Sequence, residues 1–286
     1  MNLAVVGATG LIGRPVTEQL IAAGYVVTIL ARDTEKARAM FPGVRVVAAD
    51  LRNPDSLRAG LANQQAVYLN LSIKPDEKPD DFHTETDGLK TLLAEARQAG
   101  IQRIGYLSSL VMRYQGMNGF RWWAFEVKQE AVRLLKESGI PASIFYASTF
   151  METLSMQVQG SWLPLAGHSE VAMWFIAGRD YGRQVARAFS LPGHENREYV
   201  IQGPEPLTYA AAAKVFAKHY PRQKLKIVTA PLGVLKLLGR FNRSIDYGAH
   251  ILEALNGYPE QFEAAQDWIE LGQPTLTLAD YARQAP

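Results

Sequence analysis

Short β-branched runs alternate with longer helical patterns through the first half of the chain, and this alternation constrains the fold more than any other feature. Between the runs, apolar residues recur at the three- to four-residue spacing of amphipathic helices. A helix after each strand brings consecutive strands into parallel alignment, and right-handed crossovers place helices on both faces of the sheet. The pattern therefore predicts an α/β fold with a Rossmann-type, doubly wound parallel sheet. The expected strands are 3–7, 25–32, 44–50, 65–72, 101–109 and 141–148.

The alternation loosens after about residue 150, where helical patterns predominate. No linker rich in proline, glycine or serine separates the two halves, and no internal repeat is found. We therefore expect a Rossmann domain over residues 1–150 and a smaller, helix-rich C-terminal lobe over residues 151–286, packed directly on the first. A strand and a helix are expected within 171–191, a strand at 197–203, and helices at 208–220, 231–241 and 247–257.

Composition and charge exclude several classes of protein. Of the 286 residues, 48% are hydrophobic and 20% are charged, which is ordinary for a globular chain. Cysteine is absent and the five histidines lack ligand spacing, so no metal site is expected. The net charge of +2 comes without a lysine- or arginine-rich tract, so no nucleic-acid partner is expected. Without a signal-like N-terminus or an apolar run of about 18 residues, we expect a cytoplasmic protein with no membrane partner.

Three glycines stand three residues apart in the segment LAVVGATGLIGRPVTEQL, between the first expected strand and the first expected helix. In a phosphate-binding turn, Gly7 would make the sharp bend, Gly10 would let the backbone approach a pyrophosphate, and Gly13 would let the helix pack closely. The helix N-terminus adds unpaired N–H groups and a positive dipole end. The alternative is a tight turn without a ligand. The residues expected at the pyrophosphate are Gly7, Thr9, Gly10, Leu11, Ile12 and Gly13.

The end of the second strand distinguishes between the two nicotinamide dinucleotides. Folds specific for NAD usually carry an acidic residue here, which accepts hydrogen bonds from ribose hydroxyls. This chain instead has Arg32, with Lys36 one helical turn later, and a guanidinium pairs bidentately with a 2′-phosphate. We therefore expect NADP(H) to be preferred. Asp33 follows at once and is able to reach a ribose, which keeps NAD(H) open, and the alternative for Arg32 is a solvated charge.

Residues at the carboxyl ends of the third and fourth strands complete the expected cofactor site. Ligands of open α/β sheets bind at these ends. Asp50 and Leu51 follow the third strand, where a carboxylate and an apolar side chain would flank the adenine. Asn70 and Ser72 close the fourth strand, beside the central ribose.

Further ordered motifs support a family resemblance. They are VVGATGLIGRPV, the strand end at Arg32, AAD before Leu51, YLSSL at 106–110, FEVKQEAVRLLKESGIPASIF at 125–145, TFMETL at 149–154, GRDYGRQVARAF at 178–189 and YVIQGPEPLTYAAAAKVF at 199–216. With this set, the chain resembles the atypical or extended short-chain dehydrogenase/reductase superfamily, and within it the NmrA-like and isoflavone-reductase-like branch. The resemblance thins after about residue 217. It implies an NAD(P)-binding domain over residues 1–150.

The Tyr-x-x-x-Lys motif of this superfamily is incomplete here. In the superfamily the phenol is the acid–base, and the lysine lowers its pKa and holds the nicotinamide ribose. Lys128 matches the lysine, but Ala124 stands at the tyrosine position and cannot transfer a proton. The resemblance places Ser108 or Ser109 at the family's serine position. Tyr114, in the loop before Lys128, would substitute for the missing phenol, or would simply pack.

Two functions are compatible with this departure. In the isoflavone-reductase-like branch, a lysine without its tyrosine still supports reduction, which implies NADPH-dependent hydride transfer to a small apolar acceptor such as a quinone or an enone. The catalytic residues would then be Lys128, Tyr114 and Ser109. The cofactor would be bound in addition by Ser108 and Lys128. In the NmrA-like branch proper, the protein binds the dinucleotide and reports redox state without turnover. Lys128 itself also has a purely structural alternative, in which it only forms an ion pair with Glu126 or Glu130 along its own helix.

The acceptor side is less constrained by the sequence. Trp122 and Trp123 would stack on a flat acceptor or, as we favour, anchor the two lobes. We interpret the proline-rich segment 72–83 as a solvated connection rather than a lid. A small-molecule acceptor is the expected partner, and both a monomer and a homodimer are compatible with the sequence. Residues that would line an apolar pocket, or fill the core, are Met112, Phe150, Met151, Met156 and Trp162.

Overall fold

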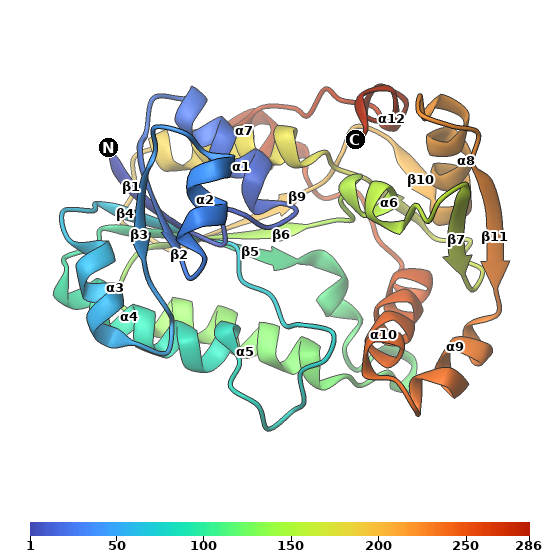
Figure 1. The fold of residues 1–286 in the computed structure, drawn as a ribbon, viewed down its shortest axis with the longest axis horizontal. Helices are drawn as coiled ribbons and strands as arrows, with labels where there is room; N and C mark the ends of the chain where they lie inside the picture. Colours follow the sequence, from blue (N-terminus) through green and yellow to red (C-terminus); the bar gives the residue numbers. More distant parts are fainter.

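A computed structural model describes residues 1–286 (Figure 1), and a seven-stranded sheet lies at its centre. The strands are all parallel and follow the order β3-β2-β1-β4-β5-β6-β9. The expected Rossmann-type sheet is confirmed. Its strands are β1 (Asn2–Val6), β2 (Val26–Ala31), β3 (Arg45–Ala48), β4 (Ala66–Leu69), β5 (Arg103–Ser109), β6 (Ala142–Ala147) and β9 (Arg197–Ile201).

Helices cover both faces of the sheet, as Figure 1 shows. α1 (Gly13–Ala22), α2 (Thr34–Met40) and α7 (Gly178–Ser190) lie on one face, and α3 (Pro54–Leu61), α4 (Leu89–Gln98) and α5 (Trp123–Glu137) lie on the other. Each face therefore has its own hydrophobic core. Because the central strands are covered on both sides, β4 and β6 are buried along their whole length.

Local sequence sets where several of these helices begin. Asn53 precedes α3, and its side-chain oxygen accepts hydrogen bonds from the backbone N–H groups of Asp55 and Ser56, while Pro54 occupies the first helical position. A five-residue π-helical turn (Thr84–Gly88) leads into α4, and 3₁₀ turns at Leu110–Tyr114 and Met117–Gly119 precede α5.

The crossovers diverge between β1 and β4, which are neighbours in the sheet. From β1 the chain proceeds outward to β2 and β3, and it then returns to β4 and proceeds the other way through β5 and β6. Loops that leave the carboxyl ends of these strands separate at such a point and leave room for a ligand.

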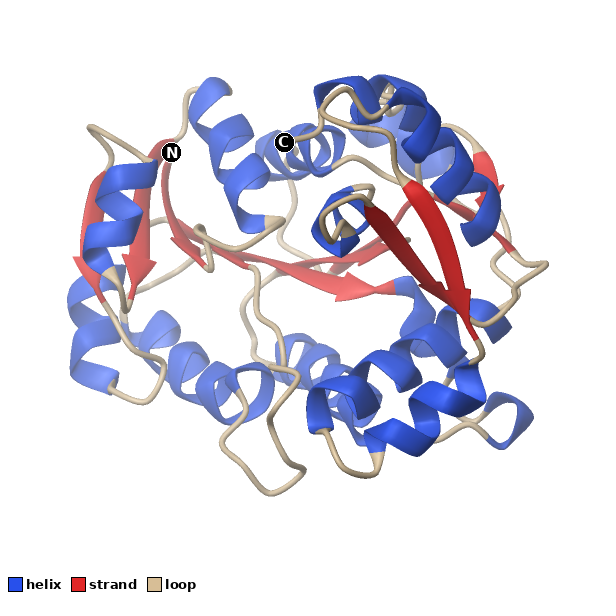
Figure 2. Cartoon of the chain, turned by 45° about the vertical axis from the view of Figure 1, so that its right-hand side comes forward, coloured by secondary structure: helices blue, strands red, loops and turns tan.

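The C-terminal lobe is built from helices and two small sheets. β7 (Trp162–Ala166) pairs in parallel with β11 (Lys226–Ala230), and β8 (Ala172–Trp174) pairs antiparallel with β10 (Pro206–Thr208). Figure 2 shows a pair of lobe strands set apart from the central sheet and flanked by helices. The helices after residue 150, other than α7, are α6 (Glu152–Gln157), α8 (Tyr209–His219), α9 (Leu232–Gly239), α10 (Arg243–Gly257), α11 (Ala265–Leu271) and α12 (Leu278–Gln284).

The central sheet continues past residue 150, where the sequence suggested a domain boundary. β9 pairs with β6, and α7 packs on α1, so two elements from the second half complete the Rossmann core. Tyr181, Phe189 and Ile201 are buried in the same core cluster as Leu3. The segment that forms α6, β7 and β8 separates β6 from α7 and interrupts the alternation, so the sequence pattern does not display this continuity.

Candidate cofactor and substrate site

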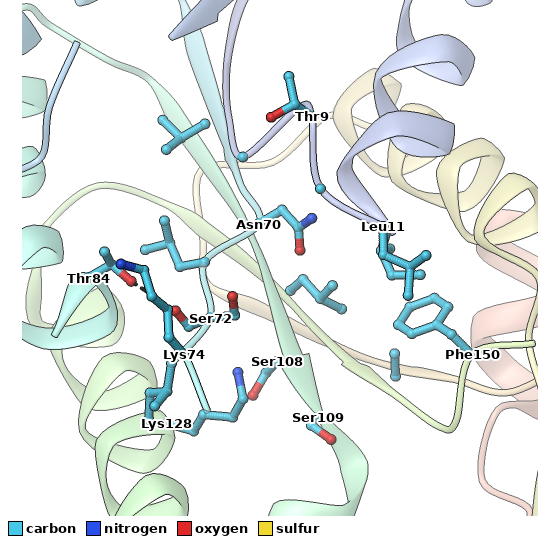
Figure 3. Close-up of a pocket in the computed structure, with 18 of the residues that line it drawn as sticks. Thr9, Leu11, Asn70, Ser72, Lys74, Thr84, Ser108, Ser109, Lys128 and Phe150 are labelled. Carbon is cyan, nitrogen blue, oxygen red and sulfur yellow. Dashed lines mark hydrogen bonds between the residues drawn. The ribbon is translucent and has the colours of Figure 1, made fainter. Parts of the chain in front are cut away.

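A cavity of about 980 Å³ opens at the carboxyl ends of the central strands, between the sheet and the C-terminal lobe. Figure 3 shows part of its lining: Thr9 and Leu11 belong to the turn after β1, Asn70 lies beneath that turn, and Ser108 and Lys128 lie on the opposite side. The cavity is lined by nearly all of the residues that the sequence assigned to the cofactor, which are Gly7, Thr9, Gly10, Leu11, Ile12, Arg32, Asp50, Leu51, Asn70, Ser72, Ser108 and Lys128.

The glycine turn after β1 has no room for side chains. Gly7 has a φ of +85°, and a Cβ atom on it would lie 2.2 Å from the carbonyl oxygen of Asn70. A Cβ on Gly13 would lie 1.9 Å from the carbonyl oxygen of Gly7, so α1 starts directly against the turn. Gly13 itself is buried and does not line the cavity.

The N-terminus of α1 is free to bind an anion. Ile12 precedes the helix and its side chain makes no capping hydrogen bond, and no acidic residue stands in the first turn. The unpaired backbone N–H groups of a helix start and its dipole both favour a negatively charged ligand. Together with the compact glycine turn, this arrangement fits a pyrophosphate.

Unpaired cations lie at the end of β2, where the dinucleotide specificity is set. Arg32 is exposed and forms no ion pair or side-chain hydrogen bond, and Lys36 also lines the cavity. Asp33, by contrast, caps α2, because its carboxylate accepts a hydrogen bond from the backbone N–H of Lys36 at 2.9 Å. One oxygen of the Asp33 carboxylate is thus engaged with the backbone, whereas the Arg32 guanidinium has no partner.

The loop after β3 is fixed in a similar way. The Asp50 carboxylate accepts a hydrogen bond from the backbone N–H of Arg52 at 2.9 Å, and the Arg52 guanidinium lies 4.5 Å from the centre of the Phe82 ring. Leu51 is buried against Gly88. Arg52 and Phe82 also line the cavity, and the sequence analysis did not anticipate them.

The segment between β4 and the π-helical turn forms part of the cavity wall through Lys74, Glu77 and Phe82. His83 holds the segment in place: its Nδ1 lies 3.0 Å from the Glu77 carboxylate, its Nε2 lies 3.1 Å from the carbonyl oxygen of Pro79, and its ring stacks on Trp123. Most of the segment between residues 74 and 81 is exposed, as expected of a solvated connection, and His83 and Glu77 anchor it at the cavity.

Lys128 projects from α5 into the cavity and is paired with a buried glutamate from another element. Its Nζ donates to Glu85 Oε1 at 2.7 Å, and the Tyr106 hydroxyl donates to the same oxygen at 2.7 Å. Glu85 has no exposed surface, and its Oε2 has no hydrogen-bond partner. Burial, and secondarily the nearby Glu85 carboxylate, raise the pKa of Tyr106 well above its usual range. Lys128 is therefore held by Glu85, and the sequence alternative of a pair with Glu126 or Glu130 is not found.

The two serines and the tyrosine expected beside Lys128 are placed differently. Ser108 and Ser109 line the cavity at the end of β5. Tyr114 does not line it: the ring packs on Phe120 in the core, and its hydroxyl contacts Asn118 at 3.4 Å. A tyrosine in this position is not available to a ligand in the cavity.

The C-terminal lobe supplies most of an apolar wall of the cavity, and half of the side chains of this wall come from α10. Of the aromatic and methionine residues that the sequence offered for an apolar pocket, some line the cavity and others do not. Phe150 and Met156 line the cavity, Met112 and Met151 are buried in the cores, and Trp162 is exposed on β7. The apolar side chains of the wall are Phe150, Met156, Met173, Tyr247, Ile251 and Leu255.

One buried carboxylate interrupts this apolar wall. Glu260 accepts hydrogen bonds from the Ser148 hydroxyl and the Gln202 amide, each at 2.8 Å. Burial raises the pKa of Glu260 above its usual value although these hydrogen bonds oppose the shift. No group of acidic or histidine side chains able to hold a metal ion occurs in the structure, and no helix is long and apolar enough to cross a membrane.

The sequence model of the NmrA-like family matches residues 1–279 of this chain. The chain belongs to the NmrA-like family. Among its relatives, an NAD(P)H azoreductase from Xenophilus azovorans is 29% identical over 216 residues, which are 73% of this chain and 70% of the azoreductase. A photosystem II assembly factor, Ycf39 of Trieres chinensis, is 24% identical over 261 residues, which are 89% of this chain and 80% of that protein.

The fold is shared with an NADPH-dependent quinone oxidoreductase from Escherichia coli whose crystal structure holds NADPH. The two structures superpose with a TM-score of 0.74 at 20% sequence identity, over 99% of each chain. At this identity, the likeness shows that this member of the NmrA-like family has the same fold.

Several residues at the site were missed by the sequence analysis. Glu85 had a detectable signal, because it precedes Leu89, Leu92 and Ala96 at the spacing of the buried face of a helix, where a carboxylate is unexpected without a partner. Residues such as Tyr247 and Glu260 had none, because they reach the cavity only through the packing of the C-terminal lobe on the sheet.

Proposed function

We propose that this protein uses NADPH to reduce a small apolar acceptor of the quinone or enone type. The single observation that carries the proposal is the composition of one cavity: a glycine turn against a free helix N-terminus, unpaired cations at the end of β2, and a lysine held by a buried glutamate beside an apolar wall. The reductase activities named for the azoreductase and the quinone oxidoreductase support it.

The residues present fit a phosphorylated dinucleotide. The turn from Gly7 to Ile12 would bind the pyrophosphate, and Arg32 and Lys36 would bind the 2′-phosphate, since Asp33 is engaged in capping α2. Asp50 and Leu51 would flank the adenine, and Asn70 and Ser72 would flank the central ribose. NAD(H) lacks the phosphate that Arg32 would bind, so we propose NADP(H) as the preferred cofactor. When bound, the nicotinamide supplies a hydride.

Lys128 would hold the proton that the reduced acceptor needs. Its ammonium lies at the cavity, with Glu85 fixing its position and Ser108 and Ser109 at the neighbouring strand end. The apolar wall from α10 and α6 would exclude water and bind a flat acceptor. Tyr114 has no part in this proposal, because its hydroxyl packs in the interior.

A second candidate is a dinucleotide-binding regulator without turnover. Ala124 occupies the position of the usual catalytic tyrosine and is buried, and Tyr114 packs in the core instead of lining the cavity. One relative of this chain is named as an assembly factor and not as a reductase, which supports this second candidate.

Titration calorimetry with NADPH, NADP⁺, NADH and NAD⁺ tests the cofactor, with the wild-type chain and the Arg32→Ala variant. We expect NADPH to bind at least about tenfold more tightly than NADH, and Arg32→Ala to remove that preference without weakening NADH. If none of the four nucleotides binds, the proposed function is wrong.

NADPH oxidation in the presence of simple quinones and enones then tests turnover. A reductase should lose most of its rate in the Lys128→Ala variant while NADPH still binds. NADPH binding without oxidation of any acceptor would favour the regulator.

A further inference from the structure

The segment 221–245, PRQKLKIVTAPLGVLKLLGRFNRSI, combines positive charge with an unusually apolar helix. It contains six basic residues and no acidic residue, in a chain whose overall charge is only +2. The segment forms β11, α9 and the start of α10. Figure 1 shows α9 at an outer corner of the C-terminal lobe, beyond the end of β11.

α9 turns large apolar side chains toward solvent. Val234, Leu237, Leu238 and Phe241 are exposed by 47%, 56%, 48% and 88%, respectively. The spacing of i, i+3 and i+4 places Val234, Leu237 and Leu238 on one face of α9, and Phe241 lies in the turn that follows the helix. Only Gly239 of this helix is buried, where it packs on the backbone of α10 at Asp246. We call the four exposed side chains the α9 stripe; a contiguous exposed apolar stripe of this kind typically marks an interaction surface.

The basic side chains of the segment are largely unneutralised. Lys236 pairs with Glu253 of α10, and Asp246, the nearest acidic residue after the segment, lies beside His250. The other five cations are exposed and take part in no ion pair. They are Arg222, Lys224 and Lys226, at the start of β11 and away from α9, and Arg240 and Arg243, which follow α9 directly.

We propose that the α9 stripe, together with the adjacent cations Arg240 and Arg243, is a docking surface for an anionic lipid bilayer. A helix with one apolar face and adjacent basic residues lies in the membrane interface, with its apolar side chains among the acyl chains and its cations at the headgroups. A second copy of this chain fits less well, because a two-fold contact would place the cations of both copies together.

A peripheral contact of this kind requires no membrane-spanning helix. The docking surface does not depend on the proposed reaction. It does, however, adjoin the cavity, because α10 packs on α9 and also supplies Tyr247, Ile251 and Leu255 to the cavity wall. A bilayer bound at α9 therefore lies one helix away from the apolar wall.

Vesicle flotation of the full chain tests the proposal, with phosphatidylcholine vesicles and with vesicles that contain about one-third phosphatidylglycerol. We expect at least about tenfold stronger binding to the anionic vesicles, and loss of most of this binding at high salt. The double variant Arg240→Gln/Arg243→Gln should weaken binding about 20-fold. The double variant Leu237→Ser/Phe241→Ser should weaken it at least about tenfold.

Matched controls use exposed residues elsewhere on the chain. Ile269→Ser removes an apolar side chain that is 79% exposed on α11, and Arg45→Gln removes an exposed, unpaired cation on β3. Both variants should bind vesicles as the wild type does. NADPH calorimetry on every variant should be unchanged, which separates loss of docking from loss of the cofactor site.

Two results would overturn the proposal. One is an absence of binding to the anionic vesicles, or binding that both double variants retain. The other is a dimer in sedimentation velocity that Leu237→Ser/Phe241→Ser converts to a monomer, since a second copy would then occupy the α9 stripe.

Discussion

Lys128 and Glu85 are 43 residues apart in the sequence, and the Lys128 Nζ lies 2.7 Å from Glu85 Oε1 beside the cavity. The glutamate is fully buried and receives a second hydrogen bond from Tyr106, so the oxygen that holds the lysine is itself fixed. A buried charge is stable only when it is paired, and the pairing in turn limits where the ammonium can point. We therefore regard Glu85 as a positioning residue for Lys128.

The Glu85→Gln variant should lower kcat by about 10- to 100-fold, because the lysine loses its fixed partner and a small displacement of a reacting group is costly. The Kd for NADPH should change less than about threefold. Glu95→Gln is the matched control, since Glu95 is also buried and paired, with Arg58, but away from the cavity. An equal loss of kcat in both variants would mean that Glu85 has only a structural role.

Gly13→Ala should destabilise the fold by about 3 kcal/mol and abolish NADPH binding, since its Cβ would overlap the Gly7 carbonyl oxygen and displace α1 from the turn. Urea unfolding and calorimetry measure the two effects. Gly248→Ala, in α10, meets no atom within 4 Å and should be neutral or stabilising by up to about 1 kcal/mol. If Gly13→Ala is equally harmless, the close packing of the turn is not required.

At the scale of elements, the C-terminal lobe is joined to the Rossmann core by short, buried polar contacts. Glu152 at the start of α6 accepts a hydrogen bond from the backbone N–H of Gly178, the first residue of α7, at 2.8 Å. The other oxygen, Oε2, is buried without a partner. Burial raises the pKa of Glu152 from 4.5 to about 7, and nearby Asp180 adds to the shift.

The raised pKa of Glu152 gives the stability of the fold a pH dependence. The folded chain binds the proton more tightly than the unfolded chain, so the contribution of this group is complete below pH 4.5 and is lost as the pH rises through 7. At pH 8, Glu152→Gln should therefore raise the free energy of unfolding by up to about 3 kcal/mol relative to wild type, with little difference near pH 4.5. Urea unfolding at both pH values measures this; a difference independent of pH would contradict it.

At the scale of the whole molecule, the cavity exists because two lobes close on the same end of the sheet. The sheet side supplies the glycine turn, the cations and Lys128, and the C-terminal lobe supplies the apolar wall and Glu260. Arg113 on the Rossmann side pairs with Glu263, and Ser148 bonds Glu260, so the lobes are tied together at the cavity. Neither half contains the site alone.

A chain that ends at residue 150 should not fold. It lacks β9 and α7, and with them buried side chains such as Tyr181, Phe189 and Ile201 that fill one face of the sheet. We expect this fragment to be insoluble or to unfold without a cooperative transition, as seen in urea titration by circular dichroism. A soluble, cooperatively folded fragment would instead establish residues 1–150 as an independent domain.

The sequence by itself determined the parallel sheet, the glycine turn and most of the residues that line the sheet side of the cavity. Those features are local: hydrophobic periodicity fixes each strand and helix, and residues that end successive parallel strands must meet at one edge of the sheet. Gly7, Arg32 and Asn70 could be assigned for that reason, whereas Lys128, which lies in α5, was assigned only through the family resemblance.

Only the tertiary structure decided which partners these residues have. Glu85 reaches Lys128 across the space between two crossovers, β9 joins the sheet after a long interruption, and Tyr114 turns into the core rather than the cavity. Such contacts depend on packing between segments that are far apart in the chain. Neither the hydrophobic periodicity nor the spacing of residues in the sequence indicates which of these side chains will be in contact.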